Sequence, residues 1–399
     1  MSDDMKEAGD GAASRQAGNR DTRIREVKVH VLETPIEGVF AYSQAWYTKR
    51  SAMIVEIVTE GGLVGWGEAF GPARITAAVV AHLRPLLLGQ DAIACDALWE
   101  RMYNSLRDHG QRGVVVEAIS AIDVALWDIR GHHFQAPIHA LLGGPLRTSV
   151  SAYATGLYRR RDDDHARYLC EEAVGYVERG FRAVKLKTGF GVDHDIRMTE
   201  AVRQAIGPDV RLMVDANHAY DVADAIRYGR AVQALDIGWL EEPVVPEDID
   251  GYVEVRRALA IPIAGGEASF GRYGFRDMLL RRCVDILQPD VAAAGGISEC
   301  KKIFDMASAF GVRCNPHVWG SGITIAASLQ LLAVVPEVPP GLFPVAPMLE
   351  FDCTDHPIRQ AVLARPLEPK NGSIEIPDLP GLGIEIDRAA LQRFAVTAA

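Results

Sequence analysis

From about residue 150 to 350 the chain repeats one pattern, a short apolar strand followed by an amphipathic helix. Repeats of this kind build a parallel sheet, because each helix returns the chain to the same edge. A run of such units closes into a barrel, whose functional groups lie at the carboxyl ends of the strands. The predicted strands are 151–154, 183–187, 211–215, 238–241, 261–264, 285–288, 312–315 and a last one near Met348.

Polar residues stand at the ends of seven of these strands. A single charge after a strand is most often a solvated loop residue. A whole set in register with the repeat instead predicts a shared site at the barrel mouth. The residues are Lys187, Asp215, Glu241, Glu267, Asp290, His317 and Glu350, separated by 28, 26, 26, 23, 27 and 33 residues.

Asp215, Glu241 and Glu267 follow three successive strands, so their carboxylates converge at one side of the mouth. Clustered anions repel, and a divalent cation relieves that repulsion. Hard oxygen ligands with room for substrate favour Mg²⁺, and we expect Mn²⁺ to substitute for it. A ring of salt bridges to nearby lysines is the structural alternative. The residues alone do not choose between Glu241 and Glu242 as the ligand.

Lys185 and Lys187 are two residues apart on one strand, so both side chains face the barrel interior. Two adjacent ammonium groups lower each other's pKa, which makes a lysine available as a base near neutral pH. Alternatively, both only neutralise the carboxylates. Asp290 and His317 end neighbouring strands and are expected to pair. An aspartate on one imidazole nitrogen fixes the tautomer and leaves the other nitrogen for proton transfer.

The N-terminal part of the chain has a different texture. Strand-like segments at 24–32, 51–59 and 63–70 predict a small antiparallel sheet. Apolar residues at spacings of three and four then predict a helix ending near Gly131 and Pro137. We expect a disordered tail over 1–22, an α+β domain over 23–148, a barrel over 149–365 and a C-terminal segment over 366–399. The helical residues are Ile119, Ile122, Leu126 and Ile129.

Composition restricts the partners. The formal net charge of −11 argues against a nucleic-acid binder, which needs an excess of Lys and Arg. The apolar stretch 323–335 is too short to span a bilayer, and residues 1–22 lack the apolar core of a signal peptide. The six cysteines are scattered without a paired motif, as in reduced proteins. A cytoplasmic enzyme acting on small molecules is expected.

The chain resembles the mandelate racemase subgroup of the enolase superfamily over nearly its whole length after residue 23. The resemblance implies an α/β fold, a modified (β/α)7β TIM-type barrel with an N-terminal α+β capping domain that the C-terminus completes. It also implies a homo-oligomer, from dimer to octamer. The motifs are Val64-Gly65-Trp66-Gly67-Glu68, residues 122–128, Leu141-Leu142-Gly143-Gly144, the Lys-x-Lys pair, Asp215-Ala216-Asn217, residues 239–243, Gly265-Gly266-Glu267 and residues 377–384.

The same resemblance implies roles. The first glutamate of the pair, Glu241, becomes the metal ligand. Lys187 becomes one base, and the histidine of the His-Asp dyad becomes the acid or base on the opposite face. Lys185 would polarise the substrate carboxylate, which Glu350 would hydrogen-bond from the far side. The implied sets are Asp215, Glu241 and Glu267 for the metal, and Lys185, Lys187, Asp290, His317 and Glu350 for catalysis.

A closer likeness, to the D-galactarolactone cycloisomerases, lies in stretches beside the site. It implies α-proton abstraction from a sugar-acid carboxylate and β-elimination through an enediolate, giving a 3-deoxy-2-keto-hexarate. Acid-sugar dehydratase, racemase or epimerase are the alternatives, and metal-assisted hydrolysis and a non-catalytic carboxylate-binding barrel are rivals of other kinds. The segment 39–47 is expected to be a loop over the substrate. The substrate-binding candidates are Tyr42, Asn217, His218, Arg272 and Trp319.

Overall fold

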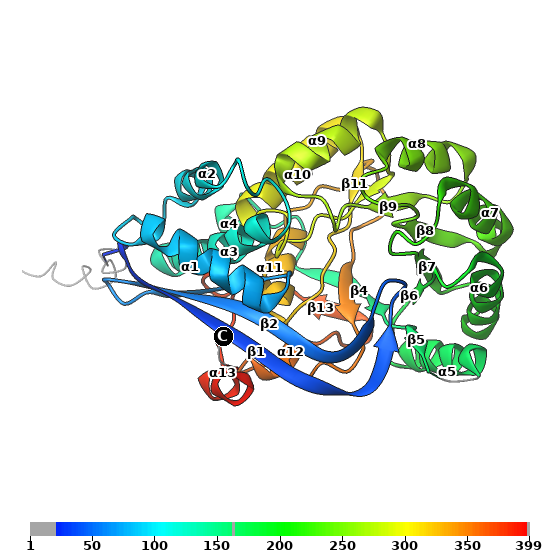
Figure 1. Cartoon of the computed structure of the whole chain (residues 1–399), viewed down its shortest axis with the longest axis horizontal. Coiled ribbons are helices and arrows are strands. Elements are labelled where there is room, and N and C mark those ends of the chain that lie inside the picture. The colour runs from blue at the N-terminus through cyan, green and yellow to red at the C-terminus, as the bar shows by residue number, and fades with distance from the viewer. Residues whose placement is uncertain (1–20, 162–163, 397–399) are drawn as a thin grey trace, which may run out of the picture.

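The computed structural model describes residues 21–161 and 164–396 (Figure 1). Most of the tail predicted to be disordered therefore lies outside the described residues. The chain forms an α+β capping domain beside a barrel of parallel strands and outer helices, and the predicted fold class is confirmed.

The capping sheet is built on one long hairpin, which extends from the cap to the barrel mouth (Figure 1). Its strands are longer than predicted, because cross-strand pairing continues to Phe40 and Tyr47, whose rings lie 5.3 Å apart. The segment 39–47, predicted as a loop, is therefore mostly strand with a short turn between. The strands are β1 (Ile24–Ala41), β2 (Trp46–Thr59), β3 (Val64–Ala69) and the two-residue β5 (Arg159–Arg160), in the order β3-β2-β1-β5.

Helices cover one face of this sheet. The longest ends at Phe134, between Gly131 and Pro137, as the sequence predicted. Gly131 also allows a close approach, because a Cβ there would lie 2.3 Å from the Cα of Gly381. The C-terminal segment therefore crosses the helix at a point that only glycine allows. The helices are α1 (Ala73–Leu87), α2 (Cys95–Ser105), α3 (Val114–Phe134) and the short α4 (Ile138–Leu141).

Eight parallel strands form the barrel sheet in the order β11-β10-β9-β8-β7-β6-β4-β12. At the seam between its end strands, the Met348 amide donates to Asn315 Oδ1 at 2.8 Å. A plug that includes Tyr153, Met213 and Trp239 fills the interior below the mouth. The strands are β4 (Ser149–Thr155), β6 (Ala183–Lys187), β7 (Arg211–Asp215), β8 (Ile237–Glu241), β9 (Ile263–Gly265), β10 (Ile286–Leu287), β11 (Arg313–Cys314) and β12 (Leu349–Asp352).

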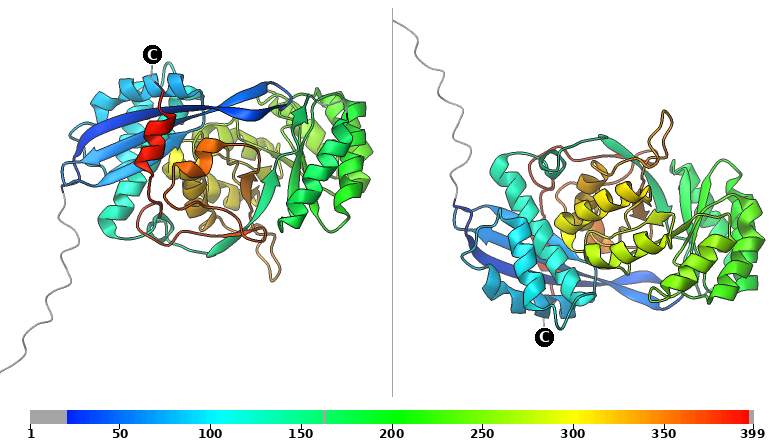
Figure 2. Two further views of the ribbon diagram at one scale, coloured as in Figure 1. Left: turned by 90° about the horizontal axis from the view of Figure 1, so that it is seen from below. Right: turned by 90° about the horizontal axis from the view of Figure 1, so that it is seen from above.

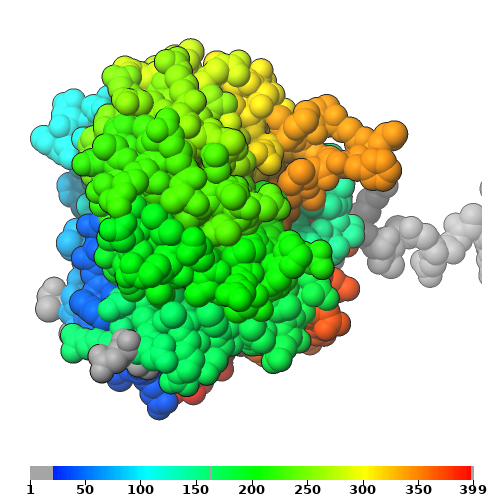
Figure 3. All heavy atoms as spheres, turned by 90° about the vertical axis from the view of Figure 1, so that its right-hand side faces the viewer, coloured from blue at the N-terminus to red at the C-terminus, as the bar shows by residue number. Residues whose placement is uncertain are grey.

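Helices surround these strands, and between α11 and β12 the chain projects as a separate lobe (Figure 3). Within the described residues, none of the helices has the length and apolar character needed to cross a membrane. The helices are α5 (His165–Glu178), α6 (Val192–Ile206), α7 (Val222–Val232), the 3₁₀ turn η1 (Gln233–Leu235), α8 (Ile249–Ala258), α9 (Gly271–Arg281), α10 (Gly296–Phe310) and α11 (Gly322–Leu332).

The C-terminal segment returns to the cap, and its last helix lies across the long hairpin (Figure 2). The Val396 amide donates to the Val31 carbonyl at 2.9 Å, and Arg388 pairs with the buried Glu56 of β2 at 2.7 Å. The C-terminal segment is therefore attached to the capping sheet. The elements of this segment are α12 (Pro357–Ala361), β13 (Ser373–Glu375), which pairs with β4, and α13 (Arg388–Phe394).

Candidate active site

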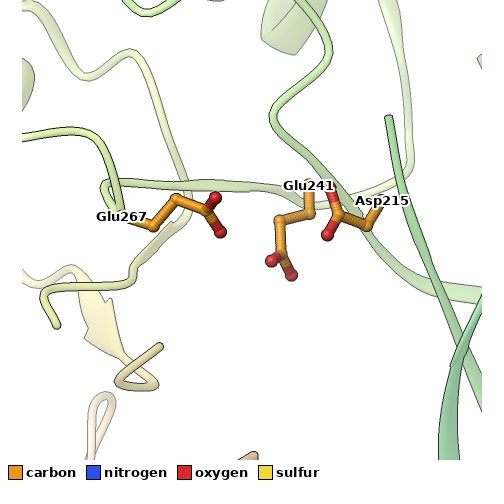
Figure 4. A group of neighbouring side chains, drawn as sticks. All are labelled: Asp215, Glu241 and Glu267. Atoms are coloured by element: carbon orange, nitrogen blue, oxygen red, sulfur yellow. The ribbon is translucent and has the colours of Figure 1, made fainter. Parts of the chain in front are cut away.

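Strand register aligns the first site residues. Lys187 pairs with Asp215 across β6 and β7, and Asp215 pairs with Glu241 across β7 and β8. Glu267 follows β9 by two residues and reaches toward Glu241 from the other side (Figure 4). One oxygen from each of Asp215, Glu241 and Glu267 lies within 4.8 Å of the other two. The structure thus brings the three predicted carboxylates together.

These carboxylates fit a hard divalent cation. All three offer oxygen ligands, which Mg²⁺ and Mn²⁺ prefer. Glu267 Oε2 is buried and accepts no hydrogen bond among the described residues, and its ion pair with His317 Nε2 at 3.3 Å leaves it free to bind a cation as well. Glu242 lies outside this trio, because its Oε2 is engaged by His218 Nδ1 at 3.0 Å. Of the two adjacent glutamates, only Glu241 belongs to the trio, which is the one that the family resemblance implied as the ligand.

Both lysines of the Lys-x-Lys pair are buried beside the carboxylates. Lys185 Nζ lies 2.6 Å from Glu241 Oε1 and 2.7 Å from Glu350 Oε1. Lys187 Nζ donates to Asp215 Oδ2 at 2.5 Å and to Asn217 Oδ1 at 3.0 Å. Alternation along β6 thus places both ammonium groups inside the barrel, as expected.

The lysine pKa values differ from the sequence prediction. Burial lowers the pKa of Lys187, and Lys185 lowers it further, but the charges of Asp215 and the other two carboxylates of the trio together outweigh both and leave it raised. Burial likewise acts against the charged form of Lys185, while Glu241 and Glu350 hold its pKa well above the ordinary value. Lys185 thus lowers the pKa of Lys187 as predicted, but the net pKa of each lysine is raised in this arrangement, because each ammonium group has an anionic partner.

The predicted His-Asp dyad is present at the mouth. His317 Nδ1 lies 2.6 Å from Asp290 Oδ2, and His317 Nε2 lies 3.3 Å from Glu267 Oε2. Burial alone would lower the pKa of His317, but Glu267, Glu350 and Asp290 raise it to about 10. Lys187 contacts Asp215 at one end of the carboxylate row in Figure 4, and His317 contacts Glu267 at the other end. An ammonium group and an imidazole therefore flank the row.

Glu350 lies between the Lys-x-Lys pair and the His-Asp dyad. Its Oε1 accepts from Thr155 Oγ1 at 2.6 Å, and its Oε2 accepts from the Val318 amide at 3.2 Å. Burial raises the pKa of the Glu350 carboxyl, but Lys185 and His317 outweigh this and hold it at about 2. Glu350 is therefore an ionised carboxylate between a lysine and a histidine.

Four of the five predicted substrate-binding residues lie at the site or on its rim, and the fifth, Arg272, does not. Asn217 contacts Lys187, and Tyr42 lies close enough to Glu267 for that charge, together with burial, to raise its pKa. Trp319 follows the histidine and packs 5.9 Å from the Tyr47 ring. His218 is a quarter exposed, on the rim. Arg272 is a correction. Its guanidinium is held by Glu299 and Glu100, where it ties α9 to α10 and to α2 of the cap.

Sequence reasoning missed the groups that hold the ligands in place. Trp239 Nε1 and Gln288 Nε2 both donate to Glu241 Oε2, at 2.7 and 2.8 Å. Trp239 stands two residues before Glu241, so strand alternation could have identified it. Thr155 and Gln288 likewise stand at strand ends, but as uncharged residues they were not considered.

Comparison with known protein families divides the chain into the same two parts as the structure does. Residues 168–390 match the enolase C-terminal domain-like family, and residues 24–143 match the N-terminal domain of the mandelate racemase / muconate lactonizing enzyme family. The chain belongs to this family of the enolase superfamily. It is 49% identical to D-galactarolactone cycloisomerase of Agrobacterium fabrum (strain C58) over 372 residues, 93% of this chain and 98% of that protein.

Solved structures agree with this membership. The 3,6-anhydro-D-galactonate cycloisomerase of Zobellia galactanivorans superposes with a TM-score of 0.86 at 39% identity, covering 94% of this chain and all of that one. A variant of L-talarate/galactarate dehydratase liganded with Mg and L-glucarate gives a TM-score of 0.84 at 29% identity, covering 99% of this chain and 97% of that one. The relatives thus include both cycloisomerases and an acid-sugar dehydratase.

Proposed function

We propose that this protein is a Mg²⁺-dependent cycloisomerase of an aldarolactone, D-galactaro-1,4-lactone or a close epimer. The observation that carries the proposal is a carboxylate trio flanked by two proton-transfer groups, in a chain half identical to a D-galactarolactone cycloisomerase. The product would be an open-chain 3-deoxy-2-keto-hexarate, isomeric with the lactone.

In the proposed reaction Asp215, Glu241 and Glu267 hold Mg²⁺, or Mn²⁺ in its place. When bound, such a cation supplies positive charge where the enediolate accumulates negative charge. Lys185 lies beside this position and adds an electrophile, worth roughly 3 to 4 kcal/mol of barrier reduction if it acts like an oxyanion donor. Lys187 or His317 removes the α-proton, according to which face carries it. Glu350 hydrogen-bonds the substrate carboxylate.

A second candidate, acid-sugar dehydratase, is favoured by the likeness to L-talarate/galactarate dehydratase. The two reactions share α-proton removal and differ in the leaving group, which is a ring oxygen in the lactone and a hydroxyl in the acyclic acid. Lactone and galactarate are therefore assayed side by side with Mg²⁺, and the product is followed by mass. A product isomeric with the lactone supports cycloisomerisation, whereas water loss from galactarate without lactone turnover would assign a dehydratase.

The two bases are predicted to act from opposite faces. Lys187→Ala and His317→Asn should each abolish solvent-deuterium incorporation at the α-carbon of the substrate whose proton faces the missing base, because the two groups lie at opposite ends of the carboxylate row. General acid–base groups contribute about 10² to 10⁴ in rate, which sets the expected loss. Mass spectrometry of substrate recovered from D₂O measures it. Parental exchange in both variants would refute the assignment.

We extend the proposal to assembly and compartment. A homo-oligomer is supported by Leu342 and Phe343, which are 94% and 97% exposed on the lobe between α11 and β12. Light scattering coupled to size-exclusion chromatography tests it, and a monomer would refute it. A reducing, cytoplasmic setting is supported by six free cysteines, four of them buried.

A further inference from the structure

Arg50 of β2 carries a buried guanidinium whose hydrogen bonding is incomplete. The residue is 3% exposed. Its Nη2 donates to Asp352 Oδ2 at 3.0 Å and to Thr354, and its Nε donates to the Asp355 carbonyl at 3.1 Å. Its Nη1 is buried without a hydrogen-bond partner in the part of the chain that the structure describes. A buried donor without a partner is unfavourable, so this Nη1 can take an acceptor that the described residues do not supply.

The charge around Arg50 is also unbalanced. A second guanidinium, that of Arg359, contacts the same Asp352 Oδ2 at 3.2 Å, and its buried Nε likewise has no described partner. Glu172, another buried carboxylate of this region, bonds the Tyr176 hydroxyl and the Leu157 amide instead. Two permanent cations therefore share one buried carboxylate. Arginine does not lose its proton in proteins, so the surplus favours binding of an anion.

This surplus lies at the wall of the active site. The Arg50 guanidinium stacks on the Trp319 ring, 4.5 Å from its centroid, two residues after the dyad histidine. The Trp319 ring lies 6.0 Å from that of Tyr158, which in turn lies 5.4 Å from Lys187 Nζ. Asp352 follows Glu350 by two residues on β12, so both point to the same side of the strand. The Arg50 guanidinium therefore lies on the same side of β12 as the Glu350 carboxylate and beyond it, toward the outside of the barrel mouth.

We propose that Arg50 binds the second, distal acidic end of the substrate and so makes the site specific for sugar diacids and their lactones over monoacids. This inference rests on the proposed function, which it refines. Asp352 and Arg359 position the guanidinium, and its Nη1 meets the distal oxygen. Sequence analysis did not identify Arg50.

The ring-opening step shows why a cation belongs there. The base takes the α-proton, the bond between the β-carbon and the ring oxygen breaks, and the electron pair stays on that oxygen. The lactone carbonyl group thereby becomes a carboxylate, and the enol left behind tautomerises to the 2-keto acid. Because the new acid is ionised, one proton is released per turnover. Arg50 meets a charge that develops as the bond breaks, and such interactions stabilise the transition state more than the ground state.

Binding of two probes tests the assignment without relying on turnover. Racemic 2-hydroxyadipate and racemic 2-hydroxyhexanoate have equal carbon chains and no oxygen on the β-carbon, so neither can undergo elimination. Titration calorimetry of the Mg²⁺-loaded enzyme should show tighter binding of the diacid. In Arg50→Gln that preference should fall about tenfold or more, the range of a charge-assisted hydrogen bond, while the monoacid binds as before.

Asp352→Asn is the matched variant with the opposite expected effect on binding of the diacid, because it leaves Arg50 in place and removes the carboxylate that competes for it. It should increase the preference for the diacid, which a purely structural role of Arg50 would not produce. Absence of any preference in the parent, equal weakening of both probes in Arg50→Gln, or an unchanged preference in Asp352→Asn would each overturn the proposal. Failure of the lactone assay with this preference intact would refute the cycloisomerase reaction and leave the Arg50 site standing.

Discussion

Glu241 and Glu242 are adjacent and both buried, yet their surroundings give them different chemistry. Glu241 faces the barrel interior, between Lys185 and the indole of Trp239. Glu242 has φ +42° and turns to the rim, where it accepts from His218. Their substitution by glutamine is therefore a matched pair, since each change replaces one carboxyl oxygen by an amide nitrogen and keeps the shape of the side chain.

We predict that Glu241→Gln weakens Mg²⁺ binding by more than about 100-fold, whereas Glu242→Gln stays within the roughly 10- to 100-fold loss typical of outer partners. The reason is that only Glu241 contributes an oxygen to the trio. Titration calorimetry on metal-stripped protein measures the difference, and circular dichroism checks that both variants fold. EDTA should abolish turnover of the parent. Equal losses in the two variants, or full activity without metal, would contradict the ligand set.

At the scale of residues, the sequence predicted those site residues that recur at a regular spacing. The polar residues at strand ends follow the period of the barrel, so their convergence could be predicted without knowing the contacts. Arg50 and Asp352 illustrate what could not be predicted. They are 302 positions apart, in different domains, and Arg50 stands in a strand with no motif around it. Which distant side chain fills a gap beside Asp352 depends on packing that a single sequence does not display.

Among the elements, helix α13 has a defined attachment to the cap. Glu56 of β2 lies 2.9 Å from His30 and 2.7 Å from Arg388 of α13. Burial raises the pKa of Glu56, but these two partners outweigh it and hold the pKa at about 2. A carboxyl whose pKa is lower in the folded state than in the unfolded state contributes stability above the unfolded pKa. That contribution is lost as the pH falls toward 2.

We therefore predict that Glu56→Gln destabilises the protein by about 1 to 3 kcal/mol near neutral pH, the range of a hydrogen bond to a charged group. The deficit relative to the parent should shrink as the pH is lowered below about 4.5. Melting curves at a series of pH values provide the measurement. Glu26→Gln is the control, because Glu26 is partly exposed and pairs only with Lys28 on the same strand among its described contacts. A deficit constant across pH would argue against the ionised pair.

The elements also show where sequence patterns predict the ends of a strand or helix and where they do not. The strands 183–187 and 211–215 were predicted to the residue, because each has apolar residues between clear turns and ends on a charged residue. The hairpin was predicted too short, because beyond Leu32 its residues alternate less clearly and the pairing is sustained by contact with β5 of the barrel domain. The end of helix α3 was predicted near Gly131 and Pro137 and lies between them at Phe134, because proline cannot continue a helix.

In the whole molecule, cap and barrel meet at a buried carboxylate. Glu68 of β3 accepts from the Ser321 amide at 2.9 Å, from the Ser321 hydroxyl at 2.6 Å and from the Thr324 hydroxyl at 2.8 Å. These donors form the first turn of α11, where the helix dipole favours a negative charge. His317 lies four residues before Ser321 on the same segment. The cap thus helps to fix the stretch that carries a proposed base.

We predict that Glu68→Ala loosens this stretch and lowers turnover while the carboxylate trio keeps its metal affinity. Several buried donors would lose their acceptor at about 1 to 3 kcal/mol each, so the first turn of α11 should open more often. Hydrogen exchange followed by mass spectrometry should show faster exchange in peptides covering 318–324 and little change in β7 and β8. Glu60→Ala, in the exposed turn before β3, should leave exchange, stability and activity within the small range of surface substitutions. If Glu68→Ala exchanged like the parent over 318–324, or lost Mg²⁺ affinity in proportion to activity, the cap would have no separate part in holding His317. Faster exchange there with intact metal binding would mean that the N-terminal domain contributes to catalysis by positioning the barrel's own base.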